Sequence, residues 1–138
     1  MVVLNCEDIG RVAANCPAYA QAGLGVAWDA VERAIAYYEG RGLSVQAVCC
    51  QATVQRRPPP RALAAKLVQC PVIDECPDPD RLFVMQLAQI YGCPFVDNWS
   101  SGGTTGQDAH GGLQRNGTKQ KVEYVFDSFG AFVPLRPA

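Results

Sequence analysis

The chain has 138 residues, of which 49% are apolar and 18% are charged, and its net charge is −1 at pH 7. This length predicts a single domain over residues 1–138, and the apolar content excludes an intrinsically disordered chain. The near-zero charge excludes a global attraction to nucleic acid, so binding of RNA or DNA would need a local basic cluster.

The chain begins with a short apolar run at residues 2–4 that ends in polar side chains, among them Asn5 and Asp8. This pattern is typical of a buried parallel strand whose carboxyl end lies at the ligand-binding crevice of an α/β sheet. The small residues over 10–25 predict a loop. Apolar residues then recur with helical spacing over 27–38 and predict an amphipathic helix.

The middle of the chain contains a second predicted buried strand at 45–54. The segment 56–61 follows as a basic loop, because its three prolines prevent it from joining a β-ladder. A short helix is predicted over 63–68 and a short strand over 71–73.

A long helix is predicted to begin at Asp78-Pro79-Asp80, which supply an N-cap, an N1 proline and a first-turn acid. In a helix, residues 82–90 would be apolar on almost every face, which predicts a helix that is covered on both sides. The elements predicted after it are a strand at 95–96 ending in Asp97, a Gly/Ser/Thr-rich loop over 100–118, and strands at 122–126 and 132–133.

This alternation of strands and helices predicts an α/β fold with a mostly parallel sheet between helical layers. No run approaches the ~20 apolar residues of a transmembrane helix, so no membrane association is expected. Four polar residues follow strands or begin the long helix, and we expect them at one edge of the sheet: Asn5, Asp8, Asp80 and Asp97. Oxygen ligands of this kind suit Mg²⁺, which can stabilise the transition state of phosphodiester hydrolysis.

Each of these acids also has a structural interpretation. Asp78 and Asp80 can cap the long helix or interact with its dipole, Asp8 can cap a turn after the first strand, and Asp97 can accept hydrogen bonds from nearby backbone amides.

The chain contains seven cysteines, an odd number, with no CxxC pair. This favours reduced thiols in an intracellular compartment, with disulfides in a secreted domain as the alternative. With His110 as the single histidine, a zinc site is not expected.

Four segments of the chain are similar to the motifs of one ribonuclease family. Residues 2–10 lie over its V-V-I-D-G-x-N-V-A, 79–88 over D-D-R-F-x-V-x-L-A with one residue of slack, 96–99 over V-x-N-D, and 124–134 over Y-x-F…F-M-P. The chain therefore resembles the NYN ribonucleases of the Regnase/MCPIP type, a branch of the PIN-domain superfamily.

The resemblance implies a PIN-like (NYN) three-layer α/β/α sandwich and a role in RNA metabolism. The activity that it implies is Mg²⁺- or Mn²⁺-dependent endonucleolytic hydrolysis of single-stranded RNA, with water as nucleophile. The implied catalytic residues are Asp8, Asp80 and Asp97, and the implied metal ligands are these three and Asn5.

The chain departs from the family at its acids. Asn5, Pro79 and Trp99 stand where the family has carboxylates, although Asp78 and Asp97 lie close by in the sequence. Because affinity for the ion depends on the summed ligand charge, we expect any Mg²⁺ to bind weakly. The alternative is a catalytically inactive module that binds RNA or a protein partner, including a second copy of itself, within a larger assembly.

Five residues are predicted to contact RNA. The family's arrangement implies that Arg56, Arg57 and Arg61 of the basic loop flank the cleft and bind phosphates, with Arg81 beside the metal edge and Trp99 stacking on a base. The alternatives are a solvated arginine loop and a tryptophan that packs in the protein.

Overall fold

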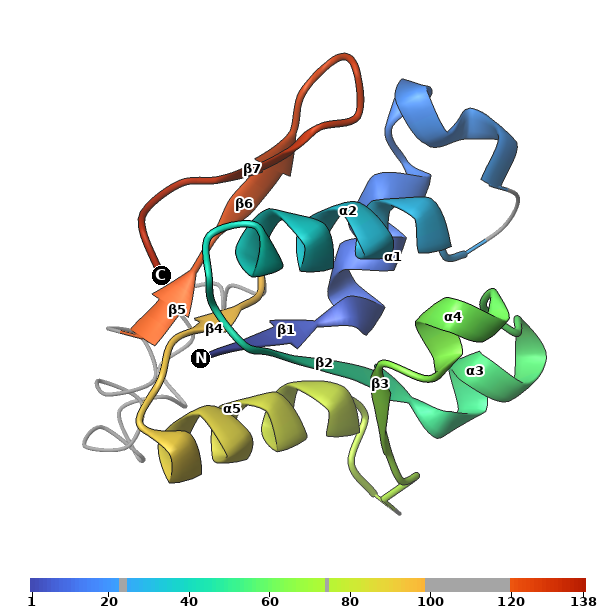
Figure 1. Ribbon diagram of the computed structural model, residues 1–138. Helices are drawn as coiled ribbons and strands as arrows, with labels where there is room; N and C mark the ends of the chain where they lie inside the picture. Colours follow the sequence, from blue (N-terminus) through green and yellow to red (C-terminus); the bar gives the residue numbers. More distant parts are fainter. Residues whose placement is uncertain (23–24, 74, 99–119) are drawn as a thin grey trace, which may run out of the picture.

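The central sheet consists of five parallel strands in the order β3–β2–β1–β4–β5. The computed structural model describes residues 1–22, 25–73, 75–98 and 120–138 (Figure 1). In β1 the buried run Val2–Asn5 lies between β2 and β4, with Leu4 in register with Ala47 on one side and Val96 on the other. The strands are β1 (Val2–Asn5), β2 (Val45–Cys50), β3 (Leu67–Cys70), β4 (Phe95–Val96) and β5 (Lys121–Val122).

Helices cover both faces of the sheet (Figure 1). Leu4 packs in a core with Ala34 and Ile35 of α2, whereas Val3 points to the other face and packs with Val84 and Ala88 of α5. The helices are α1 (Cys6–Ala14), the 3₁₀ helix η1 (Pro17–Ala22), α2 (Trp28–Glu39), α3 (Gln51–Arg56), α4 (Arg61–Ala64) and α5 (Pro79–Tyr91); an antiparallel hairpin of β6 (Tyr124–Phe126) and β7 (Phe132–Pro134) lies beside α2.

The prediction of a loop over 10–25 was wrong in its first part, because α1 follows β1 directly. The Asn5 side chain caps this helix by accepting a hydrogen bond from the Asp8 backbone N–H at 3.2 Å. Gly10 is used inside the helix for close packing, since a Cβ there would lie 2.5 Å from Cγ1 of Val26. Asp8 therefore stands in the first turn of a helix and not in a loop.

The predicted strand over 45–54 ends at Cys50, and α3 begins at the next residue, Gln51. Thr53 lies on the buried side of this short helix and Arg56 is its last residue, so the basic loop is shorter than predicted. The predicted helix at 27–38 is confirmed as α2.

The predictions for residues 63–73 were wrong. The helix α4 ends at Ala64, and the third strand is β3 (Leu67–Cys70), earlier than the predicted strand over 71–73. The apolar positions 63, 64, 67 and 68 fit a helical period only because a short helix and a strand succeed one another within six residues. Ile73, predicted in the sheet, is 39% exposed.

The long helix begins at Pro79 as predicted and ends at Tyr91, and Gly92 follows it with a φ of 61°, the left-handed C-terminal conformation that glycine favours. Its predicted burial on both sides was wrong. Leu82 is 44% exposed and Ile90 is 76% exposed, because α5 contacts the sheet on one side only.

The predicted strand at 95–96 is confirmed as β4, and the late strands correspond to β5, β6 and β7. The predicted loop over 100–118 lies outside the described residues. Within the described ranges, no helix has the length and apolar character needed to cross a membrane.

Truncation of a core residue in β1 should destabilise the fold strongly. Leu4 is fully buried, so we expect Leu4→Ala to lower the free energy of unfolding by about 2–5 kcal/mol in urea titrations. The control Leu135→Ala removes a side chain that is 58% exposed and should cost less than about 1 kcal/mol. Equal losses for the two variants would contradict this assignment of the core.

Candidate functional site

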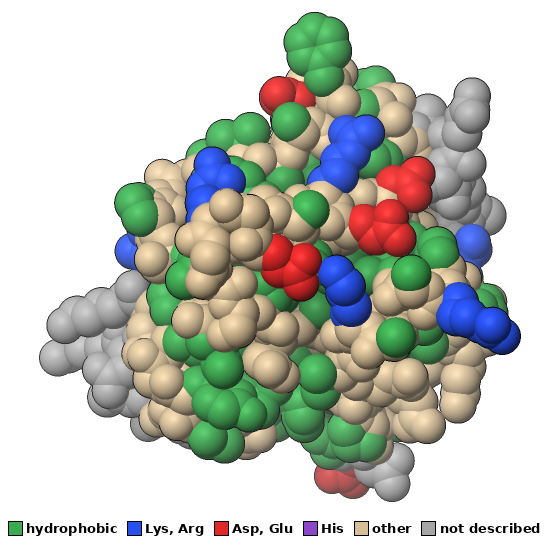
Figure 2. Space-filling view, viewed as in Figure 1, with side chains coloured by type: hydrophobic (Ala, Val, Ile, Leu, Met, Phe, Trp, Pro, Cys, Tyr) green, Lys and Arg blue, Asp and Glu red, His purple; other side chains and the backbone are tan. Residues whose placement is uncertain are grey.

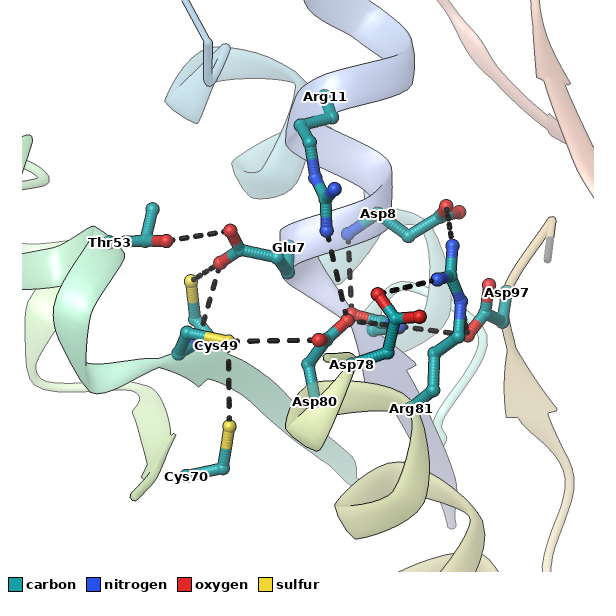
Figure 3. Close-up of polar contacts among 12 residues, drawn as sticks. Glu7, Asp8, Arg11, Cys49, Thr53, Cys70, Asp78, Asp80, Arg81 and Asp97 are labelled. Atoms are coloured by element: carbon teal, nitrogen blue, oxygen red, sulfur yellow. Dashed lines mark hydrogen bonds and ion pairs between the residues drawn. The ribbon is translucent and has the colours of Figure 1, made fainter. Parts of the chain in front are cut away.

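Polar and charged side chains gather at the carboxyl end of the parallel sheet (Figure 3). Glu7 and Asp8 come from the first turn of α1, Asp80 from the first turn of α5, and Asp97 from the residue after β4. All four are buried although they are charged. Their burial requires partners, because an unpaired carboxylate in the protein interior is costly.

The centre of this cluster is the side-chain amide of Asn5. Its Nδ2 donates to Oδ2 of Asp80 at 3.1 Å and to Oδ2 of Asp97 at 2.8 Å. Its Oδ1 accepts from the backbone N–H of Asp8, which fixes which end of the amide faces the carboxylates. Two aspartates from distant parts of the chain are thus held together by one neutral donor.

Asp8 has its own set of donors. Its Oδ2 accepts from the hydroxyl of Tyr124 at 2.6 Å and from the backbone N–H of Asn98 at 3.0 Å. Burial, together with the negative charge of Asp8, raises the pKa of Tyr124 above its ordinary range, so this phenol stays protonated and donating.

Arg81 provides positive charge to three aspartates. Its guanidinium lies 3.0 Å from Oδ1 of Asp78, 3.6 Å from Oδ1 of Asp8 and 3.9 Å from Oδ2 of Asp97. Asp78 stands at the N-cap position as predicted, but it makes no side-chain capping hydrogen bond and pairs with Arg81 instead.

Glu7 forms a second acidic group that the sequence reasoning did not identify. Its Oε1 accepts from the hydroxyl of Thr53 at 2.6 Å, and its Oε2 accepts from the thiol of Cys49 at 3.2 Å and the backbone N–H of Cys50 at 3.4 Å. Recognising α1 as a helix would have provided the signal, because Glu7 and Arg11 then lie one turn apart on the same face.

Two cavities adjoin at this end of the sheet. One, of about 700 Å³, is lined by Arg11, Arg56 and Arg57 together with Gly25 and Val26. The other, of about 310 Å³, lies beside Asp80, Cys50 and Cys70. The residues that line both are Glu7, Arg11, Thr53 and Arg56.

The structure brings Asn5, Asp8, Asp80 and Asp97 to one edge of the sheet, which is the predicted juxtaposition. Arg81 lies there too, although it is only 17% exposed and pairs with aspartates. Arg56 and Arg57 line the larger cavity. Arg61, at the start of α4, is not among the residues lining these two cavities, and Trp99 lies outside the part of the chain that the structure describes.

The carboxylates at this site face hydrogen-bond donors, an arrangement that does not suit a divalent cation. Oδ2 of Asp80 and Oδ2 of Asp97 both face the amide N–H groups of Asn5, and the oxygens of Asp8 face N–H and O–H donors. Among the described residues, no group of three or more Asp, Glu, Cys or His side chains is arranged to hold a metal ion. Hydrogen-bond donors thus occupy the positions around the carboxylates where a cation would bind.

No protein-family model and no curated protein matches the chain. Solved structures do match the chain. Nuclear protein-only RNase P 2 of Arabidopsis thaliana superposes with a TM-score of 0.71 at 16% identity, covering 99% of this chain and 29% of that chain. A crystal structure of nuclear proteinaceous RNase P 2 from the same plant gives a TM-score of 0.65 at 14% identity, covering 99% of this chain and 30% of that chain.

The chain spans less than a third of the length of these proteins. The likeness shows the fold: a PIN/NYN-like α/β domain, in which helices flank a five-stranded parallel sheet. The predicted fold class is therefore confirmed, and part of the protein-only RNase P 2 chain shares this fold. Membership of the Regnase branch in particular stays a prediction.

We expect an aspartate at position 5 to increase the affinity of this site for divalent cations. Asn5→Asp replaces the shared N–H donor by a third carboxylate, so the melting temperature should fall in EDTA and rise again with Mn²⁺. Mn²⁺ affinity, measured by calorimetry, should increase about tenfold or more over the unaltered chain. Asn15→Asp adds the same charge at an exposed position and should change neither property.

Tight Mn²⁺ or Mg²⁺ binding by the unaltered chain, equal to that of Asn5→Asp, would contradict our interpretation of the donor set.

The stability of the fold should fall at alkaline pH because of Cys49. Burial, with the charge of Glu7 beside it, raises the pKa of this thiol well above its ordinary range. Below pH ~8.5 both folded and unfolded chains keep the proton. Above that pH the unfolded chain releases it first, so this contribution to the free energy of unfolding falls by up to about 1.4 kcal/mol per pH unit.

Urea titrations between pH 7 and 10.5 with reductant present should show this decline, and Cys49→Ala should make it shallower. Parallel pH profiles for the variant and the parent would exclude Cys49 as a source of the decline.

Proposed function

We propose that the chain is an RNA-binding domain of RNA metabolism that binds single-stranded RNA in the arginine-lined cavity, and that phosphodiester hydrolysis at the adjoining acidic cluster is weak or lost. The observation that carries the proposal is the placement of Arg11, Arg56 and Arg57 around one cavity of about 700 Å³, which shares lining residues with the smaller cavity beside the buried Asp80. The RNA-nuclease-like fold supports it.

The cavity suits a phosphate backbone. Guanidinium groups bind phosphate through paired, charge-assisted hydrogen bonds, and Arg56 and Arg57 are exposed. Neither forms an ion pair with a residue that the structure describes, whereas Arg81 is engaged with three aspartates. The phosphate contacts that we predicted for Arg81 are therefore better assigned to Arg11, at the border of the two cavities.

The binding is local because the overall charge gives no attraction to RNA. On the face shown in Figure 2, acidic and basic side chains lie near one another, and neither sign forms a broad patch. We therefore expect moderate affinity that depends on a few phosphate contacts. We also propose that the domain works inside the cell, where its seven free thiols stay reduced.

Catalysis is the second candidate, favoured by the clustering of Asp8, Asp80 and Asp97 at the carboxyl end of the sheet. In it, Asp8, Asp80 and Asp97 would hold Mg²⁺ or Mn²⁺, and the bound ion would supply Lewis-acid activation of a water molecule. Labelled single-stranded RNA incubated with Mg²⁺, Mn²⁺ or EDTA separates the candidates. We expect binding with little cleavage. Metal-dependent cleavage that Asp80→Asn abolishes would establish the nuclease, and absence of RNA binding at low salt would favour a protein partner or a homodimer.

Removing the cavity arginines should weaken RNA binding and its salt dependence together. Each lost phosphate contact lowers the slope of log affinity against log salt by about 0.7 for a single strand, so Arg56→Ala with Arg57→Ala should lower it by up to about 1.4. The control Arg41→Ala with Lys66→Ala removes the same charge at two exposed positions away from the cavity.

Fluorescence anisotropy across a salt titration measures both quantities, and the melting temperature should stay nearly unchanged in all variants. Arg61→Ala should have a smaller effect than Arg56→Ala. If the cavity pair and the control pair lower the affinity equally, the cavity is not the RNA-binding surface.

A further inference from the structure

Two thiols lie in contact at the carboxyl ends of β2 and β3. Cys50 and Cys70 are register partners in the parallel sheet, and their Sγ atoms are 3.8 Å apart. All seven cysteines lie in the described part of the chain, and this is the one sulfur–sulfur contact among them.

The pair is accessible from the cavity of about 310 Å³. Both cysteines line it, and Cys50 is half-buried. By contrast, Cys6 and Cys49 are fully buried, and the thiol of Cys49 donates to Glu7. A small oxidant entering the cavity would therefore reach Cys50 first and find a second thiol beside it.

We propose that Cys50 and Cys70 form a modification site for hydrogen peroxide and similar two-electron oxidants, which join them in a disulfide bond. In the first step, one of the two sulfurs attacks a peroxide oxygen, the O–O bond breaks, and a sulfenic acid and water are formed. In the second, the other sulfur attacks the sulfenic sulfur and a second water leaves. The two thiols lose two electrons and two protons in total, and the peroxide is reduced to two waters.

The register of β2 and β3 is compatible with this bond. Neighbouring strands lie about 4.7–4.9 Å apart, within the Cα–Cα range of about 4.4–6.8 Å found in disulfides. The sulfur atoms need to approach from 3.8 Å to about 2.0 Å, which a rotation of the two side chains can supply.

The bond would also change the acidic cluster. The thiol of Cys50 lies 3.7 Å from Oδ1 of Asp80 and donates to it, and oxidation removes this donor. The modification thus acts at the wall of the cavity that adjoins the proposed RNA site, although it does not rest on RNA binding.

Variants are needed to identify the linked pair by mass spectrometry. Trypsin releases residues 42–56, which contain both Cys49 and Cys50, and residues 67–81, which contain both Cys70 and Cys76. The fully reduced chain would be treated with hydrogen peroxide, blocked with N-ethylmaleimide and digested.

We expect a linked 42–56/67–81 peptide that dithiothreitol separates, with a mass lower by two hydrogens. It should persist in Cys49→Ser and Cys76→Ser and be lost in Cys50→Ser and Cys70→Ser. Circular dichroism checks that these variants fold. Linkage that survives Cys50→Ser or Cys70→Ser, linkage lost in Cys76→Ser, or oxidation of the parent to sulfinic acid without any linked peptide would overturn the proposal. RNA binding is measured in a separate experiment, so a failure to bind RNA does not affect this test of the disulfide.

Discussion

The side-chain amide of Asn5 organises the carboxyl end of the sheet, because it connects elements that are far apart in the sequence. Its oxygen caps α1, and its NH₂ group bridges Asp80 of α5 and Asp97 after β4. The asparagine itself ends β1, the central strand. One neutral group thus sets where a helix begins on one face of the sheet and holds the acidic start of another helix on the opposite face. An amide can do this because it both donates and accepts, whereas an ionised carboxylate only accepts.

The negative charges around this amide are compensated only in part by positive side chains, and hydrogen bonds supply the rest. Four aspartates at positions 8, 78, 80 and 97 face two guanidinium groups, those of Arg81 and, 4.0 Å from Asp80, Arg11. Hydrogen bonds from Asn5, from Cys50 and from Tyr124 supply the remaining partners. In a site built for Mg²⁺ the ion provides this compensation, and the carboxylates converge on it. Here N–H, O–H and S–H groups provide much of it, which explains how the domain can bury several acids side by side and still be stable.

The sequence predicted the elements whose signal is local and continuous. Helix α2 was predicted from the helical spacing of its apolar residues, and strands β1, β2 and β4 were predicted from short apolar runs. The start of α5 was predicted from Asp78-Pro79-Asp80. Helix α1 was missed because Gly10 and the small residues after it favour a loop, and its close packing on Val26 is a tertiary contact. The boundary between α4 and β3 was missed because the apolar residues of the short helix and of the strand after it together fit the spacing of a single helix. The juxtaposition of Asn5, Asp80 and Asp97 was predictable from sheet topology, but the direction of the amide was not, because the Asp8 N–H that fixes it belongs to the missed helix.

Arg11 is the residue that connects the acidic cluster to the arginine-lined cavity. It lies on α1 one turn after Glu7, it is half exposed, and it lines both cavities while its guanidinium stays 4.0 Å from Asp80. An anion bound in the larger cavity would compete with Asp80 for this guanidinium. Because Asp80 also accepts from Asn5 and from Cys50, weakening its interaction with Arg11 would leave neutral donors as its main partners. If the proposed phosphate site is correct, binding of phosphate on one side of Arg11 would be coupled to the state of the carboxylate on the other through a single side chain. The strength of this coupling would depend on how completely Asn5 satisfies Asp80.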